Sequence, residues 1–161
     1  MRSLAVLLVA ALLTSCGPTT GGLVAEDALR QQFHTHQAAI TQILEMQEHD
    51  SRVVRIAPTF TRLDSDWSWP RKEIGLSAQR WNRYRALFKE AGISDGVQSD
   101  SGYVFFFVSS QGLAIGGTSR GFVHIDKAVA PVVDKFDDCP HLEGICYILL
   151  AKNWYLFQWT T

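Results

Sequence analysis

A serine between two glycines is the first feature of this chain that could do chemistry. Gly117-Thr118-Ser119-Arg120-Gly121 has the G-x-S-x-G spacing that holds a nucleophilic serine on a sharp turn between a strand and a helix. The residues that follow, Phe122-Val123-His124-Ile125, are typical of a strand. We therefore interpret the pattern as a glycine-flanked β-turn. A small hydrolase that uses Ser119 stays as a rival hypothesis.

The first sixteen residues carry an export signal that ends in a cysteine. Arg2 supplies a positive charge, and Leu4 to Leu13 is an unbroken run of ten apolar residues. Ten helical residues rise roughly 15 Å, about half of a hydrocarbon core, so this run is too short to span a membrane. Leu13-Thr14-Ser15-Cys16 resembles the lipobox of bacterial lipoproteins. The resemblance implies that residues 1–15 are removed as a signal peptide and that Cys16 is acylated.

The same resemblance implies a location. In lipoproteins of enteric-like bacteria, an aspartate after the acylated cysteine favours the inner membrane, whereas here that residue is Gly17. The expected product is therefore lipid-anchored in the outer membrane and faces the periplasm. An ordinary secretory signal, which would leave Cys16 as a free thiol, is the alternative. A lipobox specifies an anchor and no fold, so it implies no site residues in the rest of the chain.

Two later cysteines offer a second chemistry. Cys139-Pro140-His141 and Cys146 could supply three zinc ligands, with a nearby acid as the fourth. The oxidising periplasm instead favours a disulfide between Cys139 and Cys146, and Pro140 and Gly144 help the chain between them to reverse. We expect the disulfide, no metal site, no cofactor and no catalytic residue. Zinc ligation and free thiols stay as the alternatives.

Tryptophans and basic residues gather in one segment, from Trp67 to Lys89. Between residues 71 and 90 there are six basic and two acidic side chains, a local charge of +6 − 2 = +4 in a chain of net charge −1. Aromatic and arginine side chains are enriched where proteins bind partners, and lipid phosphates or an acidic protein would suit this charge. The alternative is a solvated helix face beside core tryptophans. The candidate interaction surface consists of Trp67, Trp69, Arg71, Lys72, Arg80 and Arg83.

Composition and charge restrict the class of protein. Removing residues 1–15 also removes Arg2 and changes the formal charge from −1 to −2, so no net basicity points to nucleic acid. The chain is 47% hydrophobic, which excludes disorder as its general state. Residues 16–22 predict a lipidated cysteine followed by a flexible tether. Residues 23–161 are enough for one domain and too few for two.

Two segments have the apolar spacing of amphipathic helices. The first runs from Glu26 to roughly Glu48, with acidic residues in its first turn. The second begins after Ser77, a favourable N-cap residue, and runs to about Glu90, where Ala91-Gly92 predicts a stop. Residues 59–76 between them indicate a loop, after a short strand at residues 52–57.

The chain after Gly96 favours strands. Tyr103 to Val108 has no polar alternation, which predicts a central strand covered on both faces. Residues 109–112 indicate a turn, and residues 113–116 and 121–126 indicate strands. Asn153 tolerates the left-handed backbone of a tight hairpin, here between residues 146–150 and 154–159. The expected fold class is α+β, with two main helices packed on an antiparallel sheet of about five strands that ends in a C-terminal hairpin.

These features favour binding over catalysis. The expected function is that of a membrane-anchored periplasmic lipoprotein, a non-catalytic binding or envelope-interaction module with a protein or anionic-lipid partner. One rival is an immunity-type lipoprotein that neutralises a toxin aimed at the envelope. A small periplasmic hydrolase, with Ser119 or a metal at Cys139, His141 and Cys146, is the other.

Overall fold

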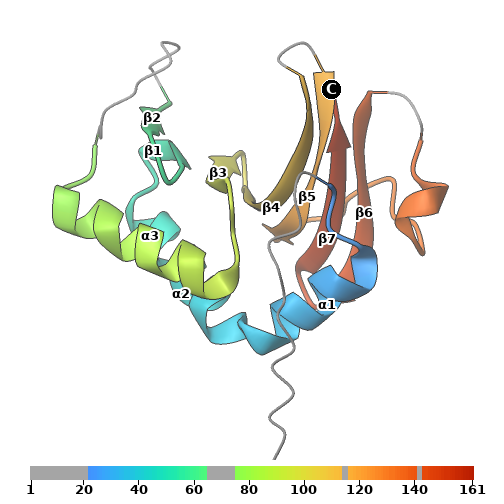
Figure 1. Cartoon of the computed structure of the whole chain (residues 1–161), viewed down its shortest axis with the longest axis horizontal. Coiled ribbons are helices and arrows are strands. Elements are labelled where there is room, and N and C mark those ends of the chain that lie inside the picture. The colour runs from blue at the N-terminus through green and yellow to red at the C-terminus, as the bar shows by residue number, and fades with distance from the viewer. Residues whose placement is uncertain (1–21, 65–74, 114–115, 141–142) are drawn as a thin grey trace, which may run out of the picture.

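One antiparallel sheet with helices on one face forms the protein (Figure 1). The structure is a computed structural model, and it describes residues 22–64, 75–113, 116–140 and 143–161. Within these ranges the helices are α1 (Glu26–Thr35), α2 (Gln37–His49), α3 (Ala78–Ala91) and the short 3-10 helix η1 (Phe136–Asp138). The strands are β1 (Val53–Ile56), β2 (Thr61–Leu63), β3 (Gly96–Asp100), β4 (Tyr103–Leu113), β5 (Gly116–Ile125), β6 (Gly144–Ala151) and β7 (Trp154–Thr160).

The expected fold class is confirmed, although the number of elements differs. The described residues form three α-helices and a seven-stranded sheet, where the sequence predicted two main helices and about five strands. The strand order is β2-β1-β3-β4-β5-β7-β6, and every pairing is antiparallel. β7 follows β6 in a hairpin in which Asn153 has φ 62°, as predicted. The C-terminal strand therefore lies inside the sheet, between β5 and β6.

The predicted first helix is two helices. α1 ends at Thr35 and α2 begins at Gln37, with His36 between them at φ −114° and ψ 20°. The change of direction lets α1 contact β5 and β7 while α2 packs against α3. The boundaries predicted for α3 are confirmed. The Ser77 side chain accepts a hydrogen bond from the Arg80 backbone N–H, and Gly92 ends the helix at φ 67°.

The predicted turn at residues 109–112 is wrong, and so is the glycine-flanked turn around Ser119. Both segments belong to the long β4–β5 hairpin, in which Ser110 pairs with Ser119 and Gln111 with Thr118. Polar, glycine-rich residues indicate a turn when a segment is considered alone, but here each strand supplies the other's backbone hydrogen bonds. The short strand β2 lies in the segment predicted to be a loop, where it pairs with β1.

The two faces of the sheet are covered differently. A row of apolar side chains crosses six strands on the helix-covered face, and each is at most 2% exposed: Ile56, Val97, Phe106, Phe122, Leu156 and Ile148. The row of neighbouring residues on the opposite, helix-free face is more polar at one end: Arg55, Gln98, Phe105, Val123, Tyr155 and Leu149. This alternation follows from the two-residue period of strands.

The segment from residue 126 to residue 133 covers one end of the helix-free face. The Lys127 ammonium lies 4.5 Å from the centre of the Tyr103 ring, and Val129 packs against the aromatic cluster of this face. The Tyr147 N–H then donates to the Pro131 carbonyl oxygen at 3.0 Å, which fixes the segment beside β6. A cleft lies at the other end of this face, and Phe107 is among the residues that line it.

Candidate functional site

Ser119 lies inside β5 and faces another serine. The Ser119 and Ser110 hydroxyl oxygens are 2.9 Å apart across the β4–β5 pair. A Cβ atom at Gly121 would overlap the Phe106 carbonyl oxygen, so that glycine is required by close approach of the β4 backbone. β5 continues to Ile125 without the turn and helix that a nucleophilic serine of this pattern needs. The G-x-S-x-G spacing therefore reflects strand pairing.

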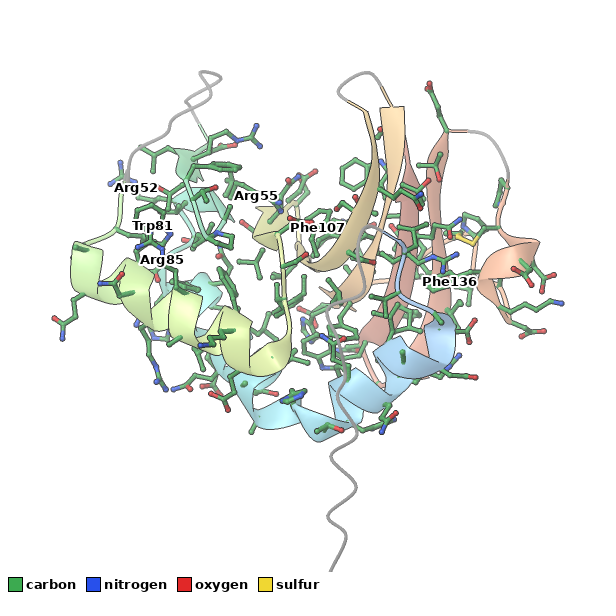
Figure 2. All side chains as sticks on the ribbon, in the orientation of Figure 1. Arg52, Arg55, Trp81, Arg85, Phe107 and Phe136 are labelled. Carbon is green, nitrogen blue, oxygen red and sulfur yellow. A yellow bond between two sulfur atoms is a disulfide. The ribbon has the colours of Figure 1, made fainter. Side chains whose placement is uncertain are left out.

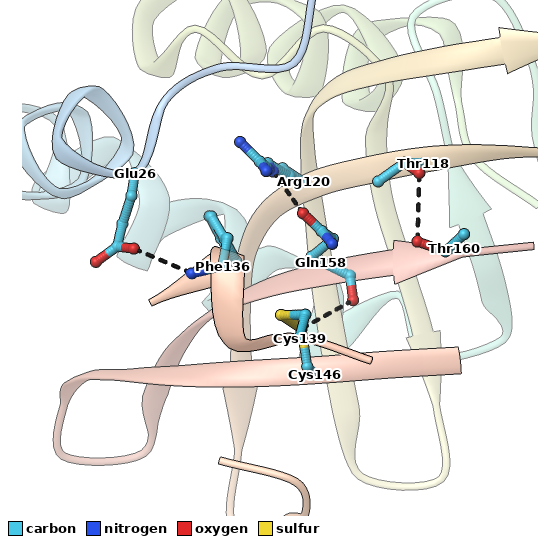
Figure 3. Close-up of a disulfide and its surroundings, with 8 residues drawn as sticks. All are labelled: Glu26, Thr118, Arg120, Phe136, Cys139, Cys146, Gln158 and Thr160. Carbon is cyan, nitrogen blue, oxygen red and sulfur yellow. Dashed lines mark hydrogen bonds between the residues drawn. A yellow bond between two sulfur atoms is a disulfide. The ribbon is translucent and has the colours of Figure 1, made fainter. Parts of the chain in front are cut away.

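The predicted disulfide between Cys139 and Cys146 is confirmed (Figure 3). It joins the end of η1 to β6, and the two Cα atoms are 5.8 Å apart. Both sulfur atoms are used in this bond, so the alternative zinc site at these cysteines does not form; His141 lies outside the described residues. Above η1, the Arg120 guanidinium lies 4.4 Å from the centre of the Phe136 ring.

The structure describes two of the six residues of the candidate interaction surface. Arg80 and Arg83 lie on α3, whereas four residues lie outside the described ranges: Trp67, Trp69, Arg71 and Lys72. A contact surface formed by all six therefore stays a prediction. The exposed Arg83 donates to the Gln42 side-chain oxygen on α2 at 2.7 Å.

Arg80 is part of a polar cluster that links α3 to the end of α2. Its Nε donates to Asp50 Oδ2 at 2.8 Å, and its Nη2 donates to the Met46 carbonyl oxygen at 3.2 Å. The Tyr84 hydroxyl donates to the same Asp50 oxygen at 2.9 Å. Burial and the Asp50 carboxylate raise the pKa of Tyr84 above its usual value. These contacts give Arg80 a structural role in addition to any part in binding.

A cleft of about 620 Å³ opens on the helix-free face, and it is the best candidate for a binding site. Three parts of the chain form its walls: the turn between β1 and β2, the residues before and within β3, and the far end of the β4–β5 hairpin with the end of β7. Its lining includes Arg55, Asp95, Gln98, Phe107, Ser110, Ser119 and Trp159.

Arg55 is the residue that distinguishes this cleft. Its guanidinium carbon lies 4.3 Å from the centre of the Phe107 ring, and Figure 2 shows the two residues between the β1–β2 hairpin and β4. Its Nη2 donates to the Asp95 carbonyl oxygen at 2.8 Å. Its Nη1 is buried and has no hydrogen-bond partner among the described residues. An unpaired buried donor costs about 1–3 kcal/mol, more when it is charged, so it needs an acceptor.

The position of Arg55 is fixed from two sides. β1 pairs with β3, which places Arg55 opposite Gln98. The segment before β3 is held on β4, because the Asp95 N–H donates to the Phe107 carbonyl oxygen at 3.1 Å. Burial lowers the pKa of Arg55 to about 10, while the nearby Asp95 carboxylate acts in the opposite direction. The guanidinium is therefore still charged at neutral pH.

A hydrogen-bonded chain of side chains forms the opposite wall of the cleft. The Ser110 hydroxyl donates to Asp95 Oδ2 at 2.8 Å, and its oxygen lies 2.9 Å from the Ser119 oxygen. An ionised carboxylate accepts and cannot donate. Ser110 therefore uses its hydrogen on Asp95, and Ser119 must donate to Ser110. The Ser119 oxygen then keeps lone pairs that can accept a hydrogen bond from a donor on another molecule.

A second hollow, of about 840 Å³, lies between the end of α2, β2 and the β3–β4 turn. Its innermost polar side chain, Gln47, donates to the Val53 carbonyl oxygen at 2.8 Å and to Ser99 Oγ at 3.2 Å. The Gln47 side-chain oxygen is buried without a partner among the described residues. Asp64 at its rim directly precedes residues outside the described ranges. In the Arg55 cleft the unpaired atom belongs to a charged group, so that cleft is the stronger candidate.

Sequence reasoning missed the residues of this cleft. Arg55 lies within a strand that was predicted, but no local pattern marks it as a buried cation. Asp95 follows α3, and Trp159 ends the C-terminal hairpin. A signal does exist for Arg55, because a basic residue between apolar Val54 and Ile56 in a short strand must face away from the core or find a partner.

No group of three or more His, Cys, Asp or Glu side chains in the described ranges could hold a metal ion. Likewise, none of the helices described is both long and apolar enough to cross a membrane. Comparison of the chain with protein families, with curated proteins and with solved structures gives no match.

Proposed function

We propose that this chain is a lipid-anchored lipoprotein of the bacterial cell envelope that binds a ligand, without catalysis, in the Arg55 cleft. One observation supports this most strongly: a buried, charged Nη1 of Arg55 without a partner among the described residues, beside a cleft of ligand size. A ligand acceptor would complete its hydrogen bonds. The cleft serine, Ser119, bonds to Ser110, which favours recognition over nucleophilic attack.

The proposed anchor is Cys16, in the outer membrane with the domain in the periplasm. The described chain contacts the domain from Val24 onward, since the Val24 N–H donates to Ser109 Oγ at 3.0 Å and Arg120 donates to the Val24 carbonyl oxygen at 3.2 Å. Residues 16–22 would then tether the domain within about 25 Å of the bilayer. Two or more acyl chains would hold it stably, because each buried methylene contributes about 0.8 kcal/mol.

The anchor is tested by replacing its cysteine. Cys16→Ser should abolish labelling by a radioactive fatty acid and move any processed protein to the soluble periplasmic fraction. The matched control is the double variant Cys139→Ala/Cys146→Ala, which removes the other two cysteines and should keep both the label and the membrane location. Membrane location with intact labelling in Cys16→Ser would contradict the assignment.

The binding site is tested with the full chain purified in detergent. A panel of small anions, sugars and peptides is screened for an increase in melting temperature, which a ligand of the native state must produce. We expect a stabilising compound whose effect is lost in Arg55→Gln and kept in Arg83→Gln, a matched change at an exposed arginine far from the cleft. A compound that stabilises Arg55→Gln as much as the parent protein would place the site elsewhere.

A further inference from the structure

The side chains of the cleft specify a class of ligand, and this inference rests on the binding function proposed above. We infer that the cleft takes an acidic sugar, a hydroxylated ring that carries a single carboxylate. The carboxylate would accept from Arg55, a hydroxyl would donate to Ser119, and the ring would pack beside Trp159. A separate observation supports each of these three contacts.

Charge favours a single carboxylate. The charged side chains that line the cleft are Arg55 and Asp95, one of each sign. Among the described side chains that line the cleft, the Nη1 of Arg55 is the one polar atom that is both buried and unpaired. One charged donor beside a fixed carboxylate suits a monoanion, because a phosphate dianion would meet repulsion from Asp95 without a second cation.

The direction of the hydrogen bonds requires a donor on the same ligand. Asp95 fixes the hydrogen of Ser110, and Ser110 in turn fixes that of Ser119, so Ser119 offers lone pairs to the cleft. A simple carboxylate such as acetate would satisfy Arg55 and leave Ser119 without a donor. A molecule with a carboxylate and a hydroxyl satisfies both, and sugar acids combine these groups on one rigid ring.

The aromatic side chains of the cleft fit the apolar face of such a ring. Trp159 is half-buried and lines the cleft on the same face as Phe107, with the two ring centres 6.4 Å apart. The positively polarised C–H groups of a sugar ring pack on the electron-rich face of an indole. Phe107 is covered by the Arg55 guanidinium, so of these two rings Trp159 is the one open to this contact.

A peptide in extended form fits this site less well. Peptides that add to a sheet bind the unpaired backbone of an edge strand. The cleft instead lies on the face of interior strands, since β4 pairs with β3 and β5, and β5 pairs with β4 and β7. Recognition there depends on side chains, which favours a compact ligand with several polar groups.

The test uses titration calorimetry of the full chain in detergent with galacturonate and its linear trimer, compared with galactose, acetate and inorganic phosphate. The NMR signal of the Trp159 indole N–H, identified by its loss in Trp159→Phe, reports whether binding occurs in the cleft. We expect the acidic sugars to bind at least tenfold more tightly than galactose, acetate or phosphate and to shift the Trp159 signal. Comparison of the affinities for the trimer and for the monomer distinguishes a site for a sugar polymer from a site for the free sugar.

Two variants keep the inference falsifiable. Arg55→Gln should weaken galacturonate binding at least tenfold, and Ser119→Ala, a smaller change in an exposed hydroxyl group, should weaken it about threefold while the melting temperature stays near that of the parent. Arg83→Gln is the control and should bind normally. The Ser119 variant decides the matter if Arg55→Gln does not fold.

The outcomes separate the ligand class from the binding function. If galactose, acetate or phosphate binds in the cleft as tightly as galacturonate, the acidic-sugar inference is overturned and the binding function stands. If a peptide from the screening panel binds in the cleft and galacturonate does not, the acidic-sugar inference is also overturned and the binding function stands. If no compound shifts the Trp159 signal, both proposals fail.

Discussion

The two faces of the same sheet differ in what completes them. On the helix-covered face, Phe106, Phe122 and Leu156 are fully buried under α1, α2 and α3, and the protein supplies all of their contacts. On the helix-free face, the segment from residue 126 to residue 133 covers one end, and the cleft lies at the other. Arg55 there stacks on Phe107 but keeps one buried donor unpaired.

One face therefore serves stability, and the other can serve binding. Close packing without polar groups stabilises a fold but offers nothing specific to a ligand. A buried cation with an unsatisfied donor costs stability, and only a partner removes that cost. The helix-covered face therefore holds the fold, and the helix-free face holds the candidate site. Four measurements test this assignment of roles to the two faces.

The largest effect should come from truncating the helix-covered core. Phe122→Ala removes a ring with no exposed surface and should lower the free energy of unfolding by about 3–5 kcal/mol. Trp159→Ala, on the helix-free face, should cost less than half as much because that ring is already half-exposed. Urea unfolding followed by circular dichroism measures both. Equal losses of unfolding free energy in the two variants would show that the two faces contribute equally to stability.

The disulfide should come next, because Cys139 and Cys146 belong to the helix-covered core. Cys139→Ala/Cys146→Ala opens an eight-residue loop and should lower the free energy of unfolding by roughly 2.5 kcal/mol in the chain-entropy model. Urea unfolding followed by circular dichroism measures this loss, and the parent protein with a reducing agent is the matched control. The stabilisation that a cleft ligand produces should be the same in this variant as in the parent protein. Its loss would show that the disulfide on the helix-covered face affects binding on the helix-free face.

Charge reversal separates a structural arginine from a solvated one. Arg80→Glu places two carboxylates together, since Asp50 accepts from Arg80 at 2.8 Å, and should cost about 1–2 kcal/mol. Arg83→Glu, one turn further along α3, should change the free energy of unfolding by less than about 0.5 kcal/mol. Thermal melts of the two variants give the comparison. Equal melting temperatures would remove the structural role assigned to Arg80.

The smallest effect should appear at alkaline pH on the helix-free face. Burial raises the pKa of Tyr147 to about 12, above its usual 10. Between these pH values the unfolded chain loses a proton that the folded chain keeps, so stability is complete below pH 10 and falls as the pH rises. We expect a loss of about 1 kcal/mol, less than the full shift implies because water screens this phenol.

Tyr147→Phe is the variant that isolates this loss. Its stability should fall less steeply between pH 10 and pH 12 than that of the parent protein, as measured by urea unfolding at each pH. Tyr84 contributes to the remaining slope, since its pKa is raised as well. Identical slopes in the parent and in Tyr147→Phe would show that the hydroxyl of Tyr147 is solvated as in the unfolded chain.

Local sequence signals predicted the elements that depend on their own residues. The Ser77 cap and the Gly92 stop define α3, and Asn153 defines the turn of the C-terminal hairpin, because each supplies a backbone conformation or hydrogen bond within a few residues. The disulfide was predictable from the spacing of the two cysteines and the expected compartment. The break at His36 was not, because α1 and α2 bend to reach different partners.

Short-range periodicity, capping and covalent reach were enough to predict the fold class, the boundaries of α3, the C-terminal hairpin and the disulfide. The pairing of the polar end of β4 with β5 and the placement of Arg55 on Phe107 beside Asp95 became visible in the folded structure. The contacts of Arg55 join residues 40 or more positions apart in the chain. Their energies depend on burial and on the partner across the sheet, and neither can be read from the neighbours in sequence.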